Sequence, residues 1–262
     1  MNKGTPQWAF NGKGLPKIDS YNKWTVNSLN VNYIEKPFYI EELPLAENVY
    51  VIDDYLAPNL HRALDHHLQH CSWQKTNEVK QDGRWWSSRG GLPNHSLWGA
   101  AFMGPNGEEG YLNGPSGYPN YLIKWLNRKL QTDFGFEWVR FQYAGANSQL
   151  HGQQGTCHSD CQDYDEWNLS FLYYTNQFWN PNWGGRLRFY DTNVKGGTLE
   201  DMDEYEIGAV DFVPNRLLMF DGRIQHGAEA PSEDAKYIDR KSIVIRGDEC
   251  VLLNKEDRYA NH

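Results

Sequence analysis

The sequence predicts a mainly β protein with flanking helices, built as a jelly-roll-like antiparallel sandwich. Two observations carry this prediction. A series of short strand-like segments follows Phe136, each bounded by Gly, Pro, Asn or Asp, and the helix-like segments come before them. The aromatic content of 15% also suits a sheet-rich protein with an aromatic-lined groove. The expected strands are FEWVRFQYA, WNLSFLYYT, GRLRFYD, GAVDFV, RLLMF, RIQHGA and SIVIR.

The chain begins with a polar, weakly periodic segment, residues 1–46, which we predict to be an N-terminal arm. Residues 47–262 are expected to form one domain, which is consistent with the chain length. Its first strand is predicted in NVYVIDDYL, from Asn48. A helix should follow with Pro58 in its first turn, because apolar residues then recur at helical spacing, at Leu60, Leu64, Leu68 and Cys71.

The same helix carries a cluster of histidines, of which His66 and His70 are four residues apart. That spacing suits a metal site, but there is no HExxH motif. We therefore predict that His66, His67 and His70 lie mainly on a solvated face.

Residues 80–120 are dense in Gly, Pro and Trp, and are predicted to form a long loop. They contain neither GxGxxG nor GxxxxGK, so a nucleotide site is disfavoured. Trp85 and Trp86 are candidates for a substrate groove, with packing of the loop onto the core as the alternative. A second helix is expected with Pro119 in its first turn. Its buried face is predicted to comprise Tyr118, Tyr121, Leu122, Trp125 and Leu126.

The overall charge argues against two classes of partner. A net charge of -9 disfavours binding to nucleic acid and to anionic membranes. The sequence has neither a signal peptide nor an apolar run long enough to span a membrane, so a cytoplasmic protein is expected. Its four cysteines are too sparse for a disulfide framework, in agreement with a reducing compartment.

The segment TCHSDCQ, residues 156–162, contains four residues of metal-binding type. His158 and Asp160 are two residues apart, so on an extended segment both side chains point to the same side. His226, at the end of RIQHGA, is the strongest candidate for a third ligand. Two His and one carboxylate form the facial triad of non-haem Fe(II) oxygenases. The alternatives are a structural zinc, for which the chain lacks a CxxC pair, and an isolated HxD in a surface turn.

A candidate anion site follows in DRKSIVIRG. Arg240 begins a strand, and Ser242 should project to the same face. A guanidinium on a rigid strand can bind a carboxylate through two parallel hydrogen bonds, and the hydroxyl can add a third. This arrangement suits the distal carboxylate of 2-oxoglutarate.

The segments HSD, NLSFLYYTNQFWNPNWGGRLRFYD, RLLMFDGRIQHGAEAP and RKSIVIRG together resemble the Fe(II)- and 2-oxoglutarate-dependent dioxygenases, and among them the prolyl 4-hydroxylase branch. The resemblance implies a double-stranded β-helix (jelly-roll, cupin-like) core. It implies Fe(II) as cofactor, 2-oxoglutarate and O2 as cosubstrates, and ascorbate as a further candidate cofactor. The residues it assigns are His158, Asp160 and His226 to iron; Arg240, Ser242, Tyr174, Tyr143 and Leu187 to the cosubstrate; and Arg246, Trp167, Trp85 and Trp86 to the substrate.

The function implied by this resemblance is hydroxylation of an unactivated C–H bond, with a prolyl residue in a peptide or protein as substrate. Asp160 favours hydroxylation, because related halogenases carry a small residue at the carboxylate position. A free amino acid or small metabolite is the alternative substrate. A non-catalytic glycan-binding jelly roll and a cysteine hydrolase are the alternative functions. Cys157 and Cys161 are predicted to point away from the iron, since each is one residue from a ligand on an extended segment.

Overall fold

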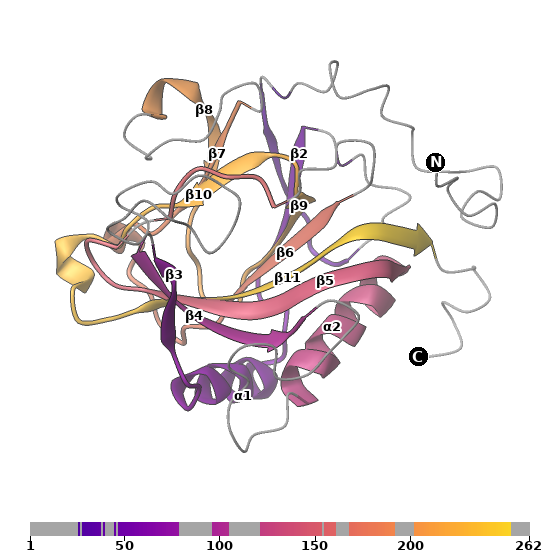
Figure 1. Ribbon diagram of the computed structural model, residues 1–262, viewed down its shortest axis with the longest axis horizontal. Coiled ribbons are helices and arrows are strands. Elements are labelled where there is room, and N and C mark those ends of the chain that lie inside the picture. Colours follow the sequence, from indigo (N-terminus) through magenta and orange to yellow (C-terminus); the bar gives the residue numbers. More distant parts are fainter. Residues whose placement is uncertain are drawn as a thin grey trace.

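The computed structural model describes residues 26, 28–37, 39, 45, 47–78, 96–104, 121–153, 155–160, 168–191 and 202–252. Within these residues the chain forms two sheets and two α-helices. Figure 1 shows α1 (Pro58–Gln69) and α2 (Tyr121–Phe134) on one side of the large sheet and the small sheet on its other side. This arrangement confirms the mainly β class with flanking helices.

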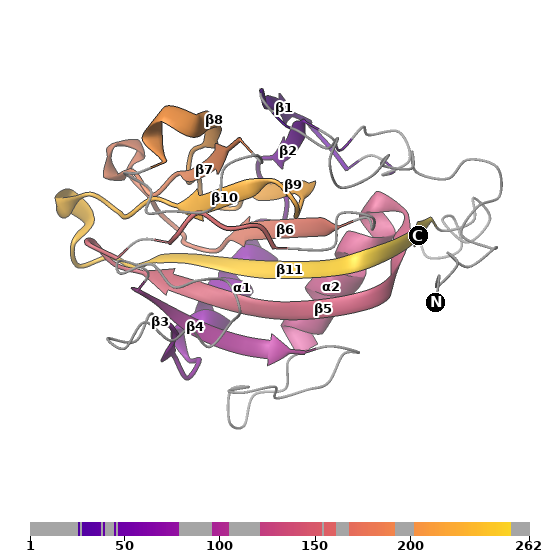
Figure 2. The ribbon, with the colours of Figure 1, turned by 45° about the horizontal axis from the view of Figure 1, so that its top comes forward.

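The large sheet contains strands from all parts of the described chain. Its order is β1 (Asn30–Tyr33), β2 (Asn48–Ile52), β9 (Leu217–Asp221), β6 (Leu169–Tyr174), β11 (Arg240–Leu252), β5 (Phe136–Gln149), β4 (Ser96–Met103) and β3 (Gln74–Glu78). Adjacent strands in this sheet are antiparallel, apart from β1 and β2, which are parallel to each other. Figure 2 shows β5 and β11 running side by side along the sheet.

The small sheet has the order β10 (Gln225–Ala228), β7 (Leu187–Tyr190) and β8 (Glu206–Val210), and all its pairs are antiparallel. The segment before Asp160 lies along the free edge of β10. There His158 and His226 exchange two backbone hydrogen bonds, of 2.9 and 2.8 Å, and Gly155 donates to Ala228. The HxD segment therefore continues the small sheet. In the described part of the chain, three short 3-10 helices connect the strands: Pro181–Trp183, Asp203–Tyr205 and Glu233–Ala235.

The two faces of the large sheet have different roles, and alternation along β11 shows which residues belong to each. Ile243 and Ile245 join the core beneath the helices, together with Phe171 and Tyr173 of β6. The intervening residues belong to the opposite face, which looks toward the small sheet. On that face lie Arg240, Ser242, Val244 and Arg246 of β11 with their cross-strand neighbours Tyr174, Leu172 and Ser170. This inner face carries the polar residues of the candidate site.

Helix α1 forms where it was predicted. Pro58 stands at its first turn, and Leu64 and Leu68 are fully buried against the sheet. The expectation for its histidines was wrong in one respect. His66 and His70 are exposed, but His67 is only 8% exposed, because the helical period places it beside the leucines, where its ring packs against Phe102.

The predicted buried face of α2 was right for Leu126, which is buried, and for Leu122, which is partly buried against the core, but wrong for Tyr121 and Trp125. The buried apolar residues are Ile123, Leu126, Leu130 and Phe134, which repeat every three or four positions and so form one continuous stripe. Tyr121 and Trp125 lie off that stripe and are 71% and 36% exposed. Tyr118 and Pro119 lie outside the described residues.

All the strands expected after Phe136 are present, with small shifts in their ends. Further strands form where none was expected. β4 lies inside residues 80–120, so this region is not a loop throughout, and β1 lies inside the predicted arm. The division into an arm and one domain remains a prediction. Among the described helices, none has the length and apolar character needed to cross a membrane.

Candidate metal and cosubstrate site

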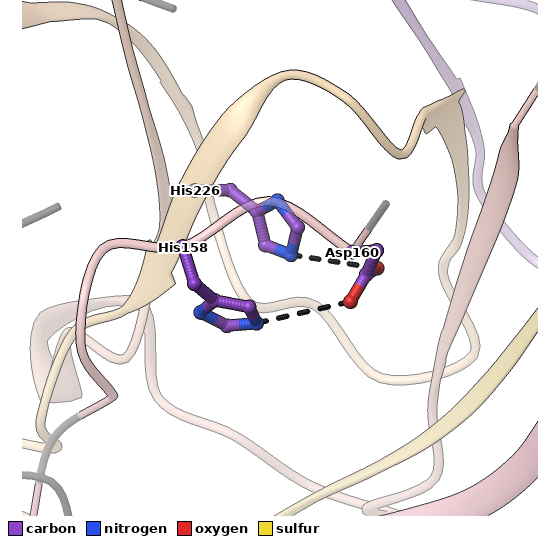
Figure 3. A group of neighbouring side chains, drawn as sticks. All are labelled: His158, Asp160 and His226. Atoms are coloured by element: carbon purple, nitrogen blue, oxygen red, sulfur yellow. Dashed lines mark ion pairs between the residues drawn. The ribbon is translucent and has the colours of Figure 1, made fainter. Parts of the chain in front are cut away.

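The structure brings His158, Asp160 and His226 together, as the sequence predicted. One ligand atom from each can be chosen such that all three lie within 4.8 Å of one another. The Nε2 of His158 is 3.8 Å from Oδ1 of Asp160, and the Nε2 of His226 is 3.6 Å from Oδ2 (Figure 3). Among the described residues, these three form the only such group of His, Cys, Asp and Glu side chains.

Backbone hydrogen bonds position the three residues. His158 and His226 are paired across the edge of the small sheet, and the amide of Asp160 donates to the carbonyl of Gly222 at 2.7 Å. A Cβ on Gly222 would lie 2.9 Å from Oγ of Ser170 and 3.2 Å from Cβ of Asp160. Only glycine allows the backbone between β9 and β10 to approach Asp160 this closely.

Both imidazole rings are oriented by backbone carbonyls. Nδ1 of His158 lies 2.8 Å from the carbonyl oxygen of Thr156, and Nδ1 of His226 lies 2.8 Å from that of Ile224. A carbonyl is an acceptor only, so these contacts favour the tautomer with the proton on Nδ1. Each Nε2 is then the ring atom that faces the carboxylate and would bind an ion.

Both oxygens of Asp160 accept hydrogen bonds from the inner face of the large sheet. Oγ of Ser170 donates to Oδ2 at 2.6 Å, and Nη1 of Arg246 donates to Oδ1. These contacts hold the carboxylate, which is 7% exposed, in one orientation. Neither partner was given this role from the sequence, although alternation along β6 places Ser170 on the same face as Tyr174.

The donor set fits a divalent transition metal. Two neutral imidazoles and one carboxylate on one face are the ligands of non-haem Fe(II) sites. Two ligand atoms at right angles around such an ion, each about 2.1 Å from it, would be about 3 Å apart. The three chosen ligand atoms lie within 4.8 Å of one another, so the side chains would have to draw somewhat closer together to bind an ion.

Arg240 is a buried cation at the start of β11, only 2% exposed. Its Nε donates to the carbonyl of Gly185 at 2.7 Å, and its guanidinium lies 5.0 Å from the ring of Tyr174 and 4.8 Å from that of Phe212. Burial lowers the pKa of Arg240, although its ordinary value is so high that the group remains charged.

Two polar atoms here make no hydrogen bond of good geometry among the described residues: Nη2 of Arg240 and the hydroxyl of Tyr174, which lie close enough for the guanidinium to oppose the effect of burial on the pKa of the phenol. Burial raises the pKa of Tyr174, so the hydroxyl keeps its proton and remains a donor. Buried donors without acceptors are costly. An anionic acceptor would satisfy both.

The other predicted cosubstrate residues lie around the same end of β11. Ser242 is 1% exposed and stands directly opposite Tyr174 in the β6–β11 ladder. Leu187 is buried in the apolar cluster that contains Tyr174 and Phe212. This cluster also includes Trp179, whose Nε1 donates to the carbonyl of Gly184. The guanidinium is therefore surrounded largely by apolar and aromatic groups.

Tyr143 lies at the other end of the inner face, away from Arg240. It stands opposite Arg246 in the β5–β11 ladder, and the guanidinium of Arg246 lies 5.3 Å from the centre of its ring. The phenol folds back over Gly145, where a Cβ would be 2.0 Å from the hydroxyl oxygen. Tyr143 thus accompanies Arg246 and Asp160, and burial raises its pKa.

Cys157 lies away from the metal-ligand group, as predicted. Its Sγ donates to Oε1 of Gln225 at 3.4 Å, and its side chain packs with Tyr190 and Met202. Cys161, Trp167, Trp85 and Trp86 lie outside the described residues. Their predicted roles therefore remain predictions.

Comparison with known proteins gives a family match and several distant structural likenesses. Residues 142–245 match the model of the 2OG-Fe(II) oxygenase superfamily. No curated protein sequence gives a match to the chain. A prolyl hydroxylase from Trichoplax adhaerens, solved in complex with a hypoxia inducible factor oxygen degradation domain peptide fragment, is 17% identical with a TM-score of 0.47. The alignment covers 82% of this chain and 87% of that one.

A Pseudomonas putida prolyl-4-hydroxylase is 14% identical, again with a TM-score of 0.47, over 77% of this chain and 92% of that one. These distant likenesses identify no substrate for this chain. The resemblance that the motifs indicated is confirmed by the family match: residues 142–245, which contain His158, Asp160, His226 and Arg240, match the model of the 2OG-Fe(II) oxygenase superfamily.

Proposed function

We propose that this protein is an Fe(II)- and 2-oxoglutarate-dependent dioxygenase that hydroxylates an unactivated C–H bond, with a prolyl residue in a peptide or protein as its substrate. One observation carries the cosubstrate assignment. The buried Nη2 of Arg240 and the hydroxyl of Tyr174 make no hydrogen bond of good geometry among the described residues, on the same inner face that contacts Asp160.

His158, Asp160 and His226 would hold the iron through Nε2, a carboxylate oxygen and Nε2. When bound, Fe(II) with 2-oxoglutarate and O2 supplies oxidising chemistry that inserts one oxygen atom into a C–H bond and leaves succinate and carbon dioxide. The chain's contribution is to orient these ligands. The carbonyls of Thr156 and Ile224 hold the rings, and Ser170 and Arg246 hold the carboxylate.

Arg240 would bind the distal carboxylate of 2-oxoglutarate, with the hydroxyl of Tyr174 as a second donor and that of Ser242 as a third. A charge-assisted hydrogen bond is strengthened where water is excluded. The rings of Tyr174 and Phe212 cover the guanidinium, and Leu187 and Trp179 are buried in the same cluster. This environment favours one fixed carboxylate over exchange with solvent.

The prolyl substrate is supported by the motif resemblance to the prolyl 4-hydroxylase branch. A free amino acid or a small metabolite is the alternative substrate. Ascorbate is a candidate for keeping the iron in its ferrous form, and its effect would be tested by omitting it from the assay.

Thermal unfolding tests the metal and cosubstrate assignment without turnover. Mn(II) should raise the melting temperature, and 2-oxoglutarate should raise it further only when Mn(II) is present. Asp160→Ala and His226→Ala should lose both increments. A glycan-binding module would respond to neither ligand, so an unchanged wild-type melting temperature would refute the assignment.

Substrate class is tested by succinate release, measured with Fe(II), 2-oxoglutarate and ascorbate. Proline-containing peptides should raise the rate above the uncoupled background, with a mass increase of one oxygen atom in the peptide. Stimulation by free amino acids but by none of the peptides would contradict the peptidyl-prolyl assignment while leaving the dioxygenase assignment intact.

A further inference from the structure

The inner face of β11 carries two arginines, one near each end of its pairing with β6. Arg240 lies near Tyr174, and Arg246 stands opposite Ser170. They are six positions apart on the strand, which corresponds to about 20 Å along the chain. A 2-oxoglutarate tail held by Arg240 would therefore lie away from Arg246, which contacts Asp160 itself.

The surroundings of the two guanidinium groups differ accordingly. The side chain of Arg246 is 24% exposed, whereas Arg240 is 2% exposed. Arg246 contacts Asp160 through Nη1 and lies over the ring of Tyr143 at 5.3 Å. It is thus a partly accessible cation held beside a metal ligand by a salt bridge and an aromatic face.

Support of Asp160 does not account for the full hydrogen-bonding capacity of Arg246. Ser170 already fixes the other oxygen of the carboxylate with a 2.6 Å hydrogen bond. A guanidinium has five N–H donors in a planar fork, so its contact with one oxygen does not exhaust its capacity to bind a second carboxylate.

The charge of Arg246 points the same way. A partly exposed guanidinium binds a carboxylate more strongly than a neutral amide, because charge-assisted hydrogen bonds are roughly twice as strong as neutral ones.

We infer that Arg246, supported by Tyr143, binds a carboxylate of the substrate, so that the reacting C–H bond belongs to a molecule or peptide segment carrying a nearby carboxylate. This inference rests on the proposed dioxygenase function and narrows its substrate class. The carboxylate is either that of the hydroxylated residue itself or that of an adjacent acidic side chain.

Paired probes distinguish these two sources. The first pair is N-acetyl-L-proline and N-acetyl-L-prolinamide, and the second is a capped Pro-Glu dipeptide amide and its Pro-Gln counterpart. Each is titrated into the wild-type protein saturated with Mn(II) and 2-oxoglutarate, and binding is followed by the melting temperature. In at least one pair the acid should bind about tenfold more tightly than its neutral partner, as expected for a charge-assisted hydrogen bond.

Two variants separate substrate binding from the support of Asp160. Arg246→Gln should abolish the preference for the acid, and Ser170→Ala should keep it, although both remove a hydrogen bond from Asp160. Mn(II) is kept saturating for each variant, so that a weaker metal site does not hide the result.

Equal binding of acid and amide in both pairs, or no binding of any probe, would overturn the inference. A preference for the acid that survives in Arg246→Gln would overturn it as well. Failure of the dioxygenase proposal would be seen separately and earlier, as a wild-type protein whose melting temperature does not respond to Mn(II) and 2-oxoglutarate.

Discussion

The hydroxyl of Ser170 donates a 2.6 Å hydrogen bond to Oδ2 of Asp160, joining the inner face of the large sheet to the candidate metal ligands. Loss of an orienting hydrogen bond to a metal ligand typically weakens metal binding by about 10–100-fold. Ser170→Ala should therefore bind Mn(II) that much more weakly, measured by calorimetric titration. Ser148→Ala is a matched control, because Ser148 donates to Asp239 at 2.8 Å. Equal losses in both variants would count against this role.

Arg240→Gln should remove the response to 2-oxoglutarate and preserve the response to Mn(II). The amide cannot supply the charge that a carboxylate requires, so we expect 2-oxoglutarate affinity to fall by about 100-fold or more. Arg186→Gln is the control, because its guanidinium pairs with Glu229 at 3.1 Å and its side chain is 40% exposed. Titration of 2-oxoglutarate at saturating Mn(II) gives the comparison. Unchanged affinity in Arg240→Gln would place the cosubstrate elsewhere.

Gly222→Ala should damage the metal site more than the fold. The added Cβ would lie 2.9 Å from Oγ of Ser170, so the hydroxyl must rotate away and lose its bond to Asp160. In Gly208→Ala, by contrast, the new Cβ would meet Leu29 at an ordinary 3.4 Å. Mn(II) affinity should fall in the first variant and stay near the wild-type value in the second. If both variants bind Mn(II) normally, the close approach at Gly222 is not needed for binding.

Asp221→Asn should strongly destabilise the fold. Asp221 and Arg223 are 0% and 1% exposed, and Nε of Arg223 donates to Oδ1 of Asp221 at 2.8 Å. Removing one partner of a buried ion pair costs about 3–5 kcal/mol, whereas loss of a surface pair costs about 0–1 kcal/mol. Urea unfolding should show the larger loss in Asp221→Asn and the smaller in Glu229→Gln, which removes the charge opposite Arg186. Similar losses would contradict this ranking.

Cys157→Ser should leave metal binding intact. The thiol donates to Gln225 and packs with Tyr190, away from the ligand group. We expect Mn(II) affinity to stay within about twofold of the wild-type value, because a thiol that does not bind the ion adds nothing to its coordination. A large loss of affinity would revive the idea of a thiolate ligand and weaken the iron assignment.

Alternation and residue chemistry predicted much of the inner face. His158 and Asp160 point to the same side because they are two residues apart on an extended segment, and the same holds for Arg240 and Ser242. These relationships hold for any extended segment, whatever packs against it. The strands after Phe136 were predictable for the same reason, since their apolar residues alternate between the two cores.

Features that depend on neighbouring elements were not predictable in this way. β4, SLWGAAFM, has no β-branched residue and is held as a strand by its ladders to β3 and β5. β1, NVNY, is a short edge strand defined by its pairing with β2. The contact between Arg246 and Asp160 joins residues 86 positions apart, and a long arginine side chain can point in many directions. Only the packed structure selects one.

The backbone pairing of His158 with His226 has a consequence for how the site is assembled. Because each residue donates to the other's carbonyl, the spacing of the two imidazole-bearing positions is set by a sheet ladder rather than by an ion. Metal uptake would then require little ordering of the chain. The amide hydrogens of both residues should exchange slowly with solvent in the metal-free protein. Removal of the metal by a chelator should leave the backbone hydrogen bonds between His158 and His226 in place.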